Sequence, residues 1–461
     1  MAEDFGEWYR RMLSENVLVD DRYEIKGMLV YRGNAMYMIR QMTGYLEGML
    51  EADGHEPTLF PVLIPENLLM REAEHIAGFE DQVYWVTHAG GNKLERKLAL
   101  RPTSETCMYP MFALWTRTFQ DLPIKVHQTV AVYRCETKQT RPLIRSREFY
   151  WNEGHTAFAT REEALSNIET IKGIYTKLIN GLLCLPVQVN VRPQWDKFPG
   201  AEYTIAFETL MPDGRTLQVA TVHNLGQHFS RVFNIEFDDE KGEKHHAWQT
   251  SYGPGFGRLL AATISVHGDG KGMVLPPRIA PTQVVIIPVI FKDADKAHVM
   301  EYVRGLEESL KREGFRVKVD ASDGRPGAKY YLWEGRGVPL RIEVGPREVK
   351  ENKVLLVRRD TGGKMSVGRD AIDLKALFSQ IESDMRVKAA KRFDDRLYDA
   401  KTLDEFKELV VKGIVTVGWC GRDECAKPIE EVGTILTVLE DSGKCVACGK
   451  GGKMLRVART Y

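Results

Sequence analysis

The chain has 461 residues, which at ordinary domain sizes predicts about three domains and excludes a single small module. Hydrophobic residues make up 43% and charged residues 28%, with 40 glycines and 20 prolines, so collagen-like and disordered chains are excluded. The 64 lysines and arginines balance the 64 aspartates and glutamates, so any basic surface that binds nucleic acid must be local.

The beginning of the sequence, MAEDFGEWYRRML, carries acidic residues and a tryptophan where a secretory signal needs a basic start and an apolar core. No apolar run in the sequence approaches the ~18 residues that a membrane span requires. We therefore expect a cytoplasmic protein with no membrane partner.

Residues 34–50 form the first clear predicted helix. Their apolar side chains recur at three- and four-residue steps, and Asn34 stands where an N-cap would. The apolar segment 58–65 follows and predicts a strand, in which prolines that cannot donate to a ladder favour an edge position. A helix leading into such a strand would suit a subunit contact, but a core helix beside an edge strand fits the pattern equally well.

Short alternating runs of apolar and polar residues predict antiparallel strands in the rest of the first 280 residues. These runs lie within 83–101 and 125–153, and then at 187–191, 216–222 and 245–251. The fold class expected for residues 1–280 is therefore α+β, with an antiparallel sheet at its centre.

A second domain, residues 281–385, begins where the pattern changes to a continuous apolar strand at 284–290. Buried strands interleaved with helices predict a small parallel-type α/β domain. Its other predicted parts are a helix that ends at Gly314, strands at 315–319, 340–344 and 354–357, a loop at 323–327, and a helix at 374–385. The charged stretch 386–396 then leads into a third domain, residues 386–461.

The densest cluster of charged and aromatic residues spans 132–155. Its arginines, Arg134, Arg141, Arg145 and Arg147, lie on two strand-like segments joined by a polar loop. Such a hairpin would direct several guanidinium groups to one place, as a polyphosphate requires, because arginine offers a rigid fork that matches phosphate oxygens. The alternative is a solvated hairpin in which arginines pair with glutamates, which the interleaved aromatic and histidine residues disfavour.

Within this segment, Arg134-Cys135-Glu136 and Arg147-Glu148-Phe149 resemble motif 2 of the class II aminoacyl-tRNA synthetases. The longer string from Thr140 to His155 resembles the prolyl-tRNA synthetases in particular. Other stretches resemble the same family: Gly44–Pro61 (motif 1), Leu100–Glu105, Met211–Arg215, Leu217-Gln218, His223–Gln227, Ser251–Arg258 (motif 3), His267–Asp269 and Leu275–Arg278. The resemblance therefore runs over nearly the whole chain.

This resemblance implies a class II catalytic domain on an antiparallel sheet, an anticodon-binding α/β domain and a small zinc-bearing α/β domain. It also implies chemistry in two steps. L-proline and ATP would form prolyl-adenylate and pyrophosphate, and the prolyl group would then pass to proline tRNA. ATP would act with Mg²⁺, and the enzyme would be a homodimer, with which the segment 34–61 is compatible.

The motif 2 and motif 3 residues would bind ATP. By resemblance, Arg134 holds the α-phosphate and the proline carboxylate, and Arg258 holds the γ-phosphate, so these two are the expected catalytic residues. Glu136 would meet the adenine edge, with Phe149 on one face of the ring and Arg258 on the other. The other expected ATP ligands are Arg145, Ser146, Arg147, Gln218 and Thr221. In-line attack on phosphorus fits this set, because it needs positioning and cationic stabilisation more than a dedicated nucleophile.

Proline is a small apolar ring with a secondary ammonium, so its pocket needs a carboxylate and a close aromatic wall. By resemblance, Glu105 and the Thr103 hydroxyl would bind the ammonium, and Arg134 the carboxylate. The rest of the expected substrate pocket is Trp151, Glu153, His155, Phe198, His223, Ser251 and Gly253. For Trp151 the plain alternative is core packing, and for each histidine it is an ordinary hydrogen-bonded role.

Cysteines gather near the end of the sequence, as Cys420-x4-Cys425 and Cys445-x2-Cys448. Thiolate pairs at such short spacing can close a tetrahedral zinc site, and four thiolates leave no open position, so the expected Zn²⁺ is structural. Four reduced cysteines in a packed tail are the alternative. Some members of the family end in a tyrosine that turns back towards the active site, and this sequence ends in Tyr461.

The second domain resembles the class II anticodon-binding domain at 337–347 and 357–360. Unstacked anticodon bases are read through hydrogen bonds at their edges, for which arginine suits guanine. The expected tRNA-binding residues are Arg341, Arg347 and Lys350, although a charge run is usually a solvated face.

Two features depart from the common pattern of the family. The loop that leads into motif 1, Tyr31-Arg32-Gly33-Asn34, lacks the usual proline, and motif 3 lacks a hydroxyl residue within its glycine-rich part. The stretch 156–250 is needed for the sheet, so a large inserted editing domain has no room. The rivals are a threonyl-tRNA synthetase, which would need zinc ligands in its active site, and a non-catalytic paralogue that binds tRNA or a partner through the same fold.

Overall fold

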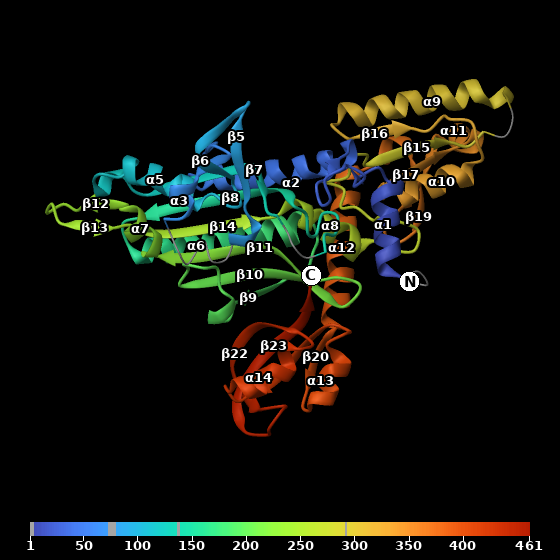
Figure 1. Ribbon diagram of the computed structural model, residues 1–461. Helices are drawn as coiled ribbons and strands as arrows, with labels where there is room; N and C mark the ends of the chain where they lie inside the picture. The colour runs from blue at the N-terminus through green and yellow to red at the C-terminus, as the bar shows by residue number, and fades with distance from the viewer. Residues whose placement is uncertain (1–3, 72–79, 136–138, 291–292) are drawn as a thin grey trace.

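The structure is a computed structural model that describes residues 4–71, 80–135, 139–290 and 293–461. Figure 1 shows an elongated body, an α/β unit to one side of it and a small unit below it that is built from residues after α12. The predicted α+β fold class is confirmed by this architecture. Among the described residues, no helix combines the length and apolar character needed to cross a membrane.

The body is built on one large, mainly antiparallel sheet. Side chains alternate along its strands between a face that packs against helices and a face that carries polar residues. The strands, each beside the next, are β3 (Glu56–Pro57), β7 (Ile124–Tyr133), β8 (Glu148–Phe158), β14 (Trp248–Pro254), β11 (Arg215–Gly226), β10 (Tyr203–Leu210) and β9 (Gln188–Val191). The antiparallel sheet predicted from alternation is therefore present, with β9 as an edge strand.

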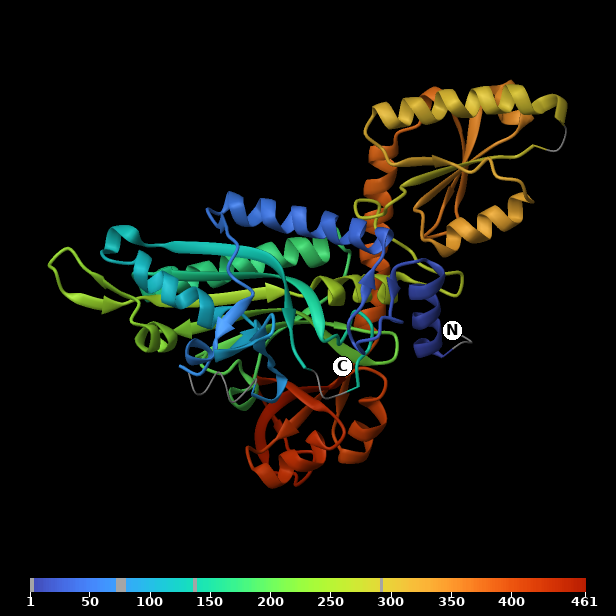
Figure 2. The ribbon, with the colours of Figure 1, turned by 45° about the horizontal axis from the view of Figure 1, so that its top comes forward.

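Three helices cover one face of this sheet: α2 (Gly33–Ala52), α6 (Arg161–Thr176) and α8 (Phe256–His267). They pack on β8, β11 and β14 and on one another, as Figure 2 shows for the blue, green and yellow-green helices. The apolar stripe of α2, including Met38, Met42 and Leu46, is fully buried. The helix ladder of α6 continues into a π-helical turn, η3 (Lys177–Leu182).

The start of α2 and the strand expected after it differ from the predictions. Arg32 is the N-cap residue of α2, and Asn34 lies inside the helix, where its Nδ2 donates to the main-chain oxygen of Asn16 over 3.3 Å. The predicted strand at 58–65 is reduced to its last residues, β4 (Leu63–Pro65). The main chain at Phe60 bonds instead to the side chains of Gln128 and Arg101, and the next residue, a proline, has no N–H to give to a ladder.

Smaller elements surround the polar face and the ends of the sheet. Helix α1 lies against the body, with Trp8 and Tyr9 fully buried. The other elements of the body are α1 (Phe5–Glu15), β1 (Val19–Asp20), β2 (Val30–Tyr31), α3 (Glu66–Leu69), η1 (Glu80–Gln82), β5 (Tyr84–Ala89), β6 (Asn92–Leu100), α5 (Glu105–Trp115), η2 (Phe119–Asp121), η4 (Gln194–Asp196), α7 (His228–Phe233), β12 (Glu236–Asp238) and β13 (Lys244–His246).

The second unit is an α/β fold whose sheet has the order β16-β15-β17-β18-β19. Strands β16, β15 and β17 are parallel, as predicted, and the two strands at the other edge are antiparallel. Its elements are β15 (Val284–Pro288), α9 (Asp293–Arg312), β16 (Val317–Val319), α10 (Pro326–Gly335), β17 (Leu340–Val344), α11 (Pro346–Glu351), β18 (Lys353–Arg358), β19 (Lys364–Gly368), η5 (Arg369–Ala371) and α12 (Leu374–Asp394).

Two predictions in this region are wrong. The expected loop at 323–327 ends early, because Pro326 takes the first position of α10, where its fixed φ favours a helix. The expected end of the last helix at residue 385 is also too early, since α12 continues to Asp394. Met385, Ala389 and Phe393 are buried at four-residue steps, so the charged stretch belongs to the helix and is not a linker.

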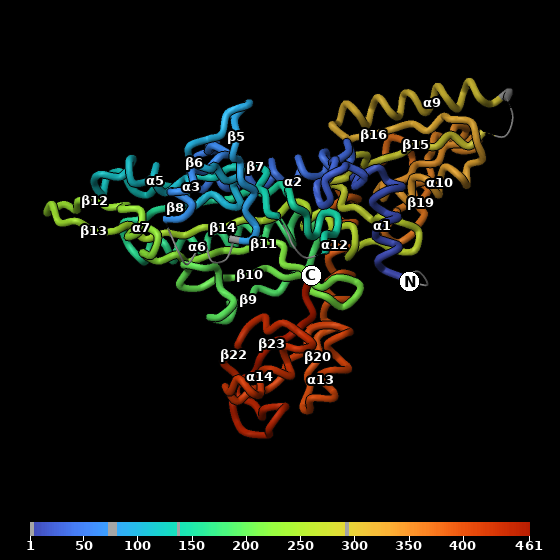
Figure 3. The backbone as a smooth tube through the Cα atoms, viewed as in Figure 1, coloured from blue at the N-terminus to red at the C-terminus, as the bar shows by residue number. Residues whose placement is uncertain are grey.

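The third unit follows α12 and is a small α/β fold around a core of its own. Its elements are β20 (Leu397–Ala400), α13 (Leu403–Leu409), β21 (Ile414–Trp419), α14 (Asp423–Glu430), β22 (Thr434–Lys444) and β23 (Gly451–Thr460). The last strand, red in Figure 3, runs back into the body, where Arg459 and Thr460 pair in parallel with Arg215 and Thr216 of β11. The sheets of the first and third units are therefore continuous.

Candidate active site

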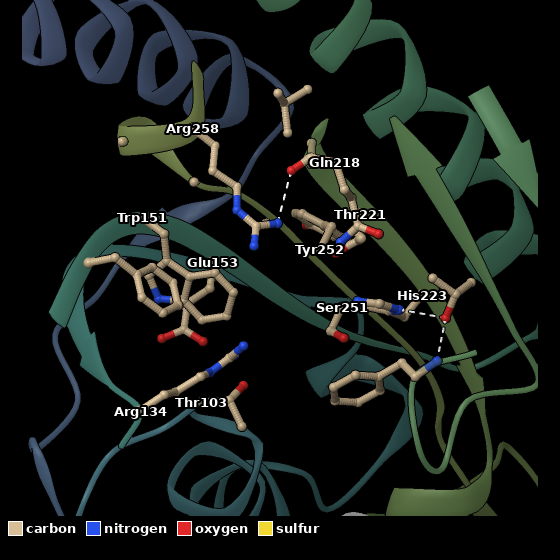
Figure 4. Close-up of a pocket in the computed structure, with 18 of the residues that line it drawn as sticks. Thr103, Arg134, Trp151, Glu153, Gln218, Thr221, His223, Ser251, Tyr252 and Arg258 are labelled. Atoms are coloured by element: carbon tan, nitrogen blue, oxygen red, sulfur yellow. Dashed lines mark hydrogen bonds between the residues drawn. The ribbon is translucent and has the colours of Figure 1, made fainter. Parts of the chain in front are cut away.

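A cavity of about 350 Å³ lies on the polar face of the central sheet, between β8, β11, β14 and the start of α8. Figure 4 shows its side chains converging from these elements and from the segments before α5 and β10. Residues far apart in the sequence line it: Thr103, Glu105, Arg134, Arg145, Ser146, Phe149, Trp151, Glu153, His155, Phe198, Gln218, Thr221, His223, Ser251, Gly253 and Arg258. The structure thus brings together almost every residue predicted to bind ATP or proline.

Two arginines enter the cavity from opposite sides (Figure 4). Arg134 follows β7, and its Nε donates to the main-chain oxygen of Pro102 over 3.0 Å. Arg258 lies in the first turn of α8, with Nε and Nη1 donating to the main-chain oxygens of Ile144 and Gln218 over 2.9 and 3.0 Å. These bonds fix the direction of both guanidinium groups, as binding of a phosphate requires.

The Arg134 guanidinium lies over two aromatic rings, 5.2 Å from the Phe149 centroid and 5.9 Å from the Trp151 centroid. Across the cavity, α8 begins directly after two glycines of motif 3, Gly253 and Gly255, so its positive end adds to the attraction for anions. At Gly257 a Cβ would lie only 2.8 Å from the Leu143 main-chain oxygen, so only glycine allows this close packing of the helix start.

The part of the cavity next to Thr103 and Arg134 carries two buried carboxylates, Glu105 and Glu153, which are 3% and 1% exposed. The Thr103 hydroxyl donates to Glu105 over 2.5 Å. Glu153 accepts hydrogen bonds from Ser104 and from Gln128, whose Nε2 lies 2.8 Å away. Burying carboxylates is costly unless a cation or several donors compensate, and the hydrogen bonds from Thr103, Ser104 and Gln128 help to hold both groups in the cavity.

His155 lies beside these carboxylates and is buried. Its Nε2 is 3.2 Å from Glu153, and its Nδ1 is hydrogen-bonded to the Tyr109 hydroxyl over 3.1 Å. Burial acts to lower the pKa of His155, but the hydrogen bond to Glu153 and the charges of Glu105 and Glu153 outweigh it, so the pKa is raised. A protonated His155 would hold Glu153 in place and balance part of its charge.

An aromatic wall closes the cavity next to the carboxylates. Phe198 and His223 lie with ring centroids 4.5 Å apart. The Thr204 hydroxyl joins them, since it accepts from the Phe198 main-chain N–H over 2.8 Å and is hydrogen-bonded to His223 Nδ1 over 2.9 Å. Ser251 Oγ and Trp151 Nε1 are buried with no hydrogen-bond partner among the described residues, and buried polar groups of this kind normally find one.

The structure does not show a position in the cavity for two predicted ATP ligands. Glu136 lies outside the described residues. The prediction for Arg147 is not supported, because this residue is not among those lining the cavity. Its main-chain N–H bonds to the Gly27 oxygen over 2.8 Å, and a Cβ added at Gly27 would lie 3.0 Å from its side-chain Cγ, so Arg147 packs against the segment before β2 instead.

Several lining residues were missed by sequence reasoning. They are Leu143, Ile144, Arg192, Asp196, Lys197, Thr204, Val219, Ala220, Tyr252, Gly255 and Gly257. Val219 and Ala220 could have been inferred from their place between Gln218 and Thr221. Within 192–204 the resemblance indicated only Phe198, and only the tertiary fold brings Arg192, Asp196, Lys197 and Thr204 to the cavity.

The last residue of the sequence, Tyr461, lies next to the cavity. Its hydroxyl donates to Asp213 over 2.7 Å, and its main-chain oxygen accepts from Arg145 Nη2 over 3.0 Å. The Arg141 guanidinium lies 5.0 Å from the ring centroid of Tyr461. The third unit thus contacts Arg145, a lining residue of the cavity.

The predicted anticodon-binding residues differ in accessibility. Arg341 is only 8% exposed, and it bonds to Glu334 and Glu343, each over 2.9 Å, with Tyr330 stacked 4.0 Å away. This guanidinium forms its ion pairs within the second unit, so the prediction that it contacts an anticodon base is not supported. Arg347 and Lys350 are exposed on α11.

The four clustered cysteines meet in the third unit, with Cys425 and Cys445 buried. Their sulfur atoms all lie within 4.8 Å of one another, and Cys420 and Cys448 are 3.7 Å apart. Zn–S bonds of about 2.3 Å in a tetrahedron place neighbouring sulfurs about 3.8 Å apart, which fits this spacing. A hydrogen bond from Arg422 lowers the pKa of Cys420 to about 6, which favours the thiolate that binds metal.

Comparisons with known proteins agree with these observations. Residues 84–267 match the tRNA synthetase class II core domain (G, H, P, S and T), and residues 283–377 match the anticodon binding domain. Proline–tRNA ligase of Methanoculleus marisnigri is 47% identical, covering 100% of this chain and 98% of its own length. The same enzyme of Methanothermobacter thermautotrophicus is 47% identical, covering 97% of this chain and 94% of its own length.

A solved structure is also closely similar over the whole length. It is the Giardia lamblia prolyl-tRNA synthetase in complex with prolyl-adenylate, with a TM-score of 0.94 and 34% sequence identity. The match covers 99% of this chain and 98% of the Giardia chain.

Proposed function

This chain belongs to the family of proline–tRNA ligases, and we propose that the cavity on its central sheet is the place where prolyl-adenylate forms. It is an aminoacyl-tRNA synthetase that uses ATP to attach L-proline to tRNA in two steps, through an enzyme-bound prolyl-adenylate. One observation supports the assignment to the cavity: two arginines anchored on main-chain oxygens face a pair of buried carboxylates within about 350 Å³.

In this proposal ATP binds between Arg134 and Arg258. Arg134 holds the α-phosphate and the proline carboxylate, which brings the attacking oxygen to phosphorus. Arg258 holds the γ-phosphate and stabilises charge on the leaving pyrophosphate, and Phe149 stacks on the adenine ring. Arg145, Ser146, Gln218 and Thr221 make the remaining contacts with the triphosphate, the ribose and magnesium. ATP enters with Mg²⁺ as its usual substrate complex, and the adenine contact of Glu136 stays a prediction.

Proline binds beside the two buried carboxylates. Glu105, held by Thr103, receives the secondary ammonium, and Glu153 with His155 completes the polar wall. Trp151, Phe198 and His223 pack around the ring, next to Ser251 and Gly253. The Ser251 hydroxyl and the Trp151 N–H, which lack partners among the described residues, would then face the substrate.

The experiment that tests the function is ATP–pyrophosphate exchange with each of the twenty amino acids. We expect a proline-selective signal in the presence of Mg²⁺. Selectivity for threonine would favour the nearest rival, but among the described residues the groups close enough to share a metal ion include none that line the cavity. Silence with every amino acid in a folded sample would favour a non-catalytic paralogue.

Alanine should give a measurable signal in the same assay. It is smaller than proline, so the pocket cannot exclude it, and lost apolar contact alone lowers the efficiency of activation about 10- to 200-fold. The stretch between β8 and β14 is occupied by the sheet and its connections, with no added domain among them. Alanine-dependent exchange that stays at the background level would contradict this prediction.

Replacing Glu105 with glutamine should raise the proline KM about 10- to 100-fold, because the neutral amide cannot pair with the ammonium. The KM for ATP should change little, since no contact with ATP is assigned to Glu105. Glu95→Gln is the matched control, because Glu95 is exposed on β6. An unchanged proline KM in Glu105→Gln would place the ammonium elsewhere.

We also propose a homodimer and a cytoplasmic location. Apolar side chains are exposed together on the segment after β3 and on α5, with Leu59 80%, Leu114 58% and Trp115 42% exposed. Covering such a patch with a second copy would remove it from water. Sedimentation should show a dimer at micromolar concentration, and Leu59→Lys should weaken it; a wild-type protein that is monomeric there would contradict the proposal.

The remaining assignments follow the three units. We propose that the second unit binds the anticodon through the exposed face of α11, with Arg347 and Lys350, and that the four cysteines hold a structural Zn²⁺. The domain division into 1–280, 281–385 and 386–461 is kept in outline, with its second boundary moved to the end of α12.

A further inference from the structure

One wall of the cavity is the segment 192–198, which contributes Arg192, Asp196, Lys197 and Phe198. Arg192 anchors its beginning, because this guanidinium bonds to Asp196 and, over 3.2 Å, to the buried Glu208 of β10. The segment follows β9, which pairs only with β10 in the described part of the sheet. Its outer side therefore has no strand to support it.

Trp195 lies in the middle of this wall but is not among the residues that line the cavity. It is 57% exposed, and its ring contacts Trp419 of the third unit with centroids 6.0 Å apart and an interplanar angle of 68°. Strand β22 of the same unit also contacts β9. The third unit therefore supports the pocket wall from outside, in agreement with its place below β9 in Figure 1.

The cysteine cluster sets the position of Trp419. Cys420 is the next residue, and the Trp419 Nε1 donates to the Arg422 main-chain oxygen over 2.9 Å. On the other side, Gly418 forms a bridge with Cys445. Both cysteine-bearing segments thus bond directly to the residues at and beside Trp419, which connects the cluster to this ring.

We propose that Trp419 and Trp195 are positioning residues that link the four-cysteine site to the proline pocket. The edge-to-face contact holds the segment 192–198 in the conformation that places Phe198 against His223 and the substrate ring. Binding of metal at the cysteine site then changes the affinity of the pocket for proline, in addition to any effect on the stability of the third unit. This inference rests on the proposed function of the cavity.

The steady-state kinetics of ATP–pyrophosphate exchange provide the first test. Trp195→Ala should raise the proline KM about three- to tenfold with little change in kcat or in the KM for ATP. Trp419→Ala should do the same, the double variant should be no worse than either single one, and Trp195→Phe should restore most of the affinity. Tyr331→Ala is the matched control, because Tyr331 is 66% exposed on α10 of the second unit.

Hydrogen exchange on the full chain provides a second readout that does not depend on activity. Removing metal with a chelator should speed amide hydrogen exchange in 192–198, and Trp419→Ala should have the same effect. The amides of β8 should remain protected from exchange in both cases. The proposal is overturned if Trp195→Ala leaves the proline KM unchanged in an active enzyme. It is also overturned if the rate of amide hydrogen exchange in 192–198 does not depend on metal. An enzyme that does not activate proline would instead refute the proposed function, and the exchange data would still decide whether the contact positions the wall.

Discussion

Replacing Arg134 with alanine is expected to lower the rate of proline-dependent pyrophosphate exchange by about 10²- to 10³-fold, the usual cost of removing one preorganised donor at a site of developing charge. The side chain is held by the Pro102 main-chain oxygen and lies over Phe149 and Trp151, so the guanidinium is already in place before substrate arrives. Its loss should therefore act mainly on kcat, with a smaller effect on the proline KM.

The matched control is Arg231→Ala, an exposed arginine on α7 in the same unit. Circular dichroism and thermal unfolding should be unchanged in both variants, since neither side chain belongs to the core. An Arg134→Ala enzyme that keeps more than a tenth of the wild-type rate would refute the assignment of this residue to the α-phosphate.

Replacing Cys445 with serine should abolish metal binding and unfold the third unit before the rest of the protein. Cys445 is buried and bridges to Gly418, so its sulfur is fixed by the backbone around it. Structural zinc contributes about 10–16 kcal/mol of binding free energy in small zinc domains, which exceeds what a core of this size supplies alone. We expect one zinc per chain in the wild type and none in the variant.

Zinc content by elemental analysis and limited proteolysis of 397–460 measure these two effects. Cys107→Ser is the control, because that thiol donates to the Ser104 oxygen and lies outside the cluster. The zinc site would be refuted if the wild-type protein, purified under reducing conditions, contained no zinc and kept its stability in chelator. The four cysteines would then be reduced thiols in a packed unit.

Patterns that are local in the sequence predicted the structure well. The apolar stripe of α2 and the alternation along β7 and β8 depend on neighbours a few residues away, so they can be recognised in the sequence alone. The motif 2 hairpin is similar, since the pairing of β7 with β8 brings Arg134 next to Phe149. Most of the cavity was instead predicted by residue number through resemblance to a known family, which assigns roles to residues far apart in the sequence.

Features set by distant contacts could not be predicted in this way. The charged stretch after residue 385 reads as a linker, but burial of Ala389 and Phe393 extends α12 through it. Arg341 sits in a stretch that resembles an anticodon-binding domain, yet it is buried where Glu343 of the same strand and Glu334 of α10 pair with it. A motif gives the type of residue at a position, whereas its accessibility depends on packing that no short pattern records.

The pairing of β23 with β11 also bears on how the protein is made. Because β11 carries Gln218, Thr221 and His223, its parallel contact with Arg459 and Thr460 joins the active-site strand to residues that are translated much later than it. A contact of such long sequence separation forms late, since the intervening chain must first fold. On a ribosome, the catalytic sheet therefore remains open at this edge until the third unit has been translated, so a stalled fragment that ends before this unit would contain every ATP-binding residue and still lack the finished site.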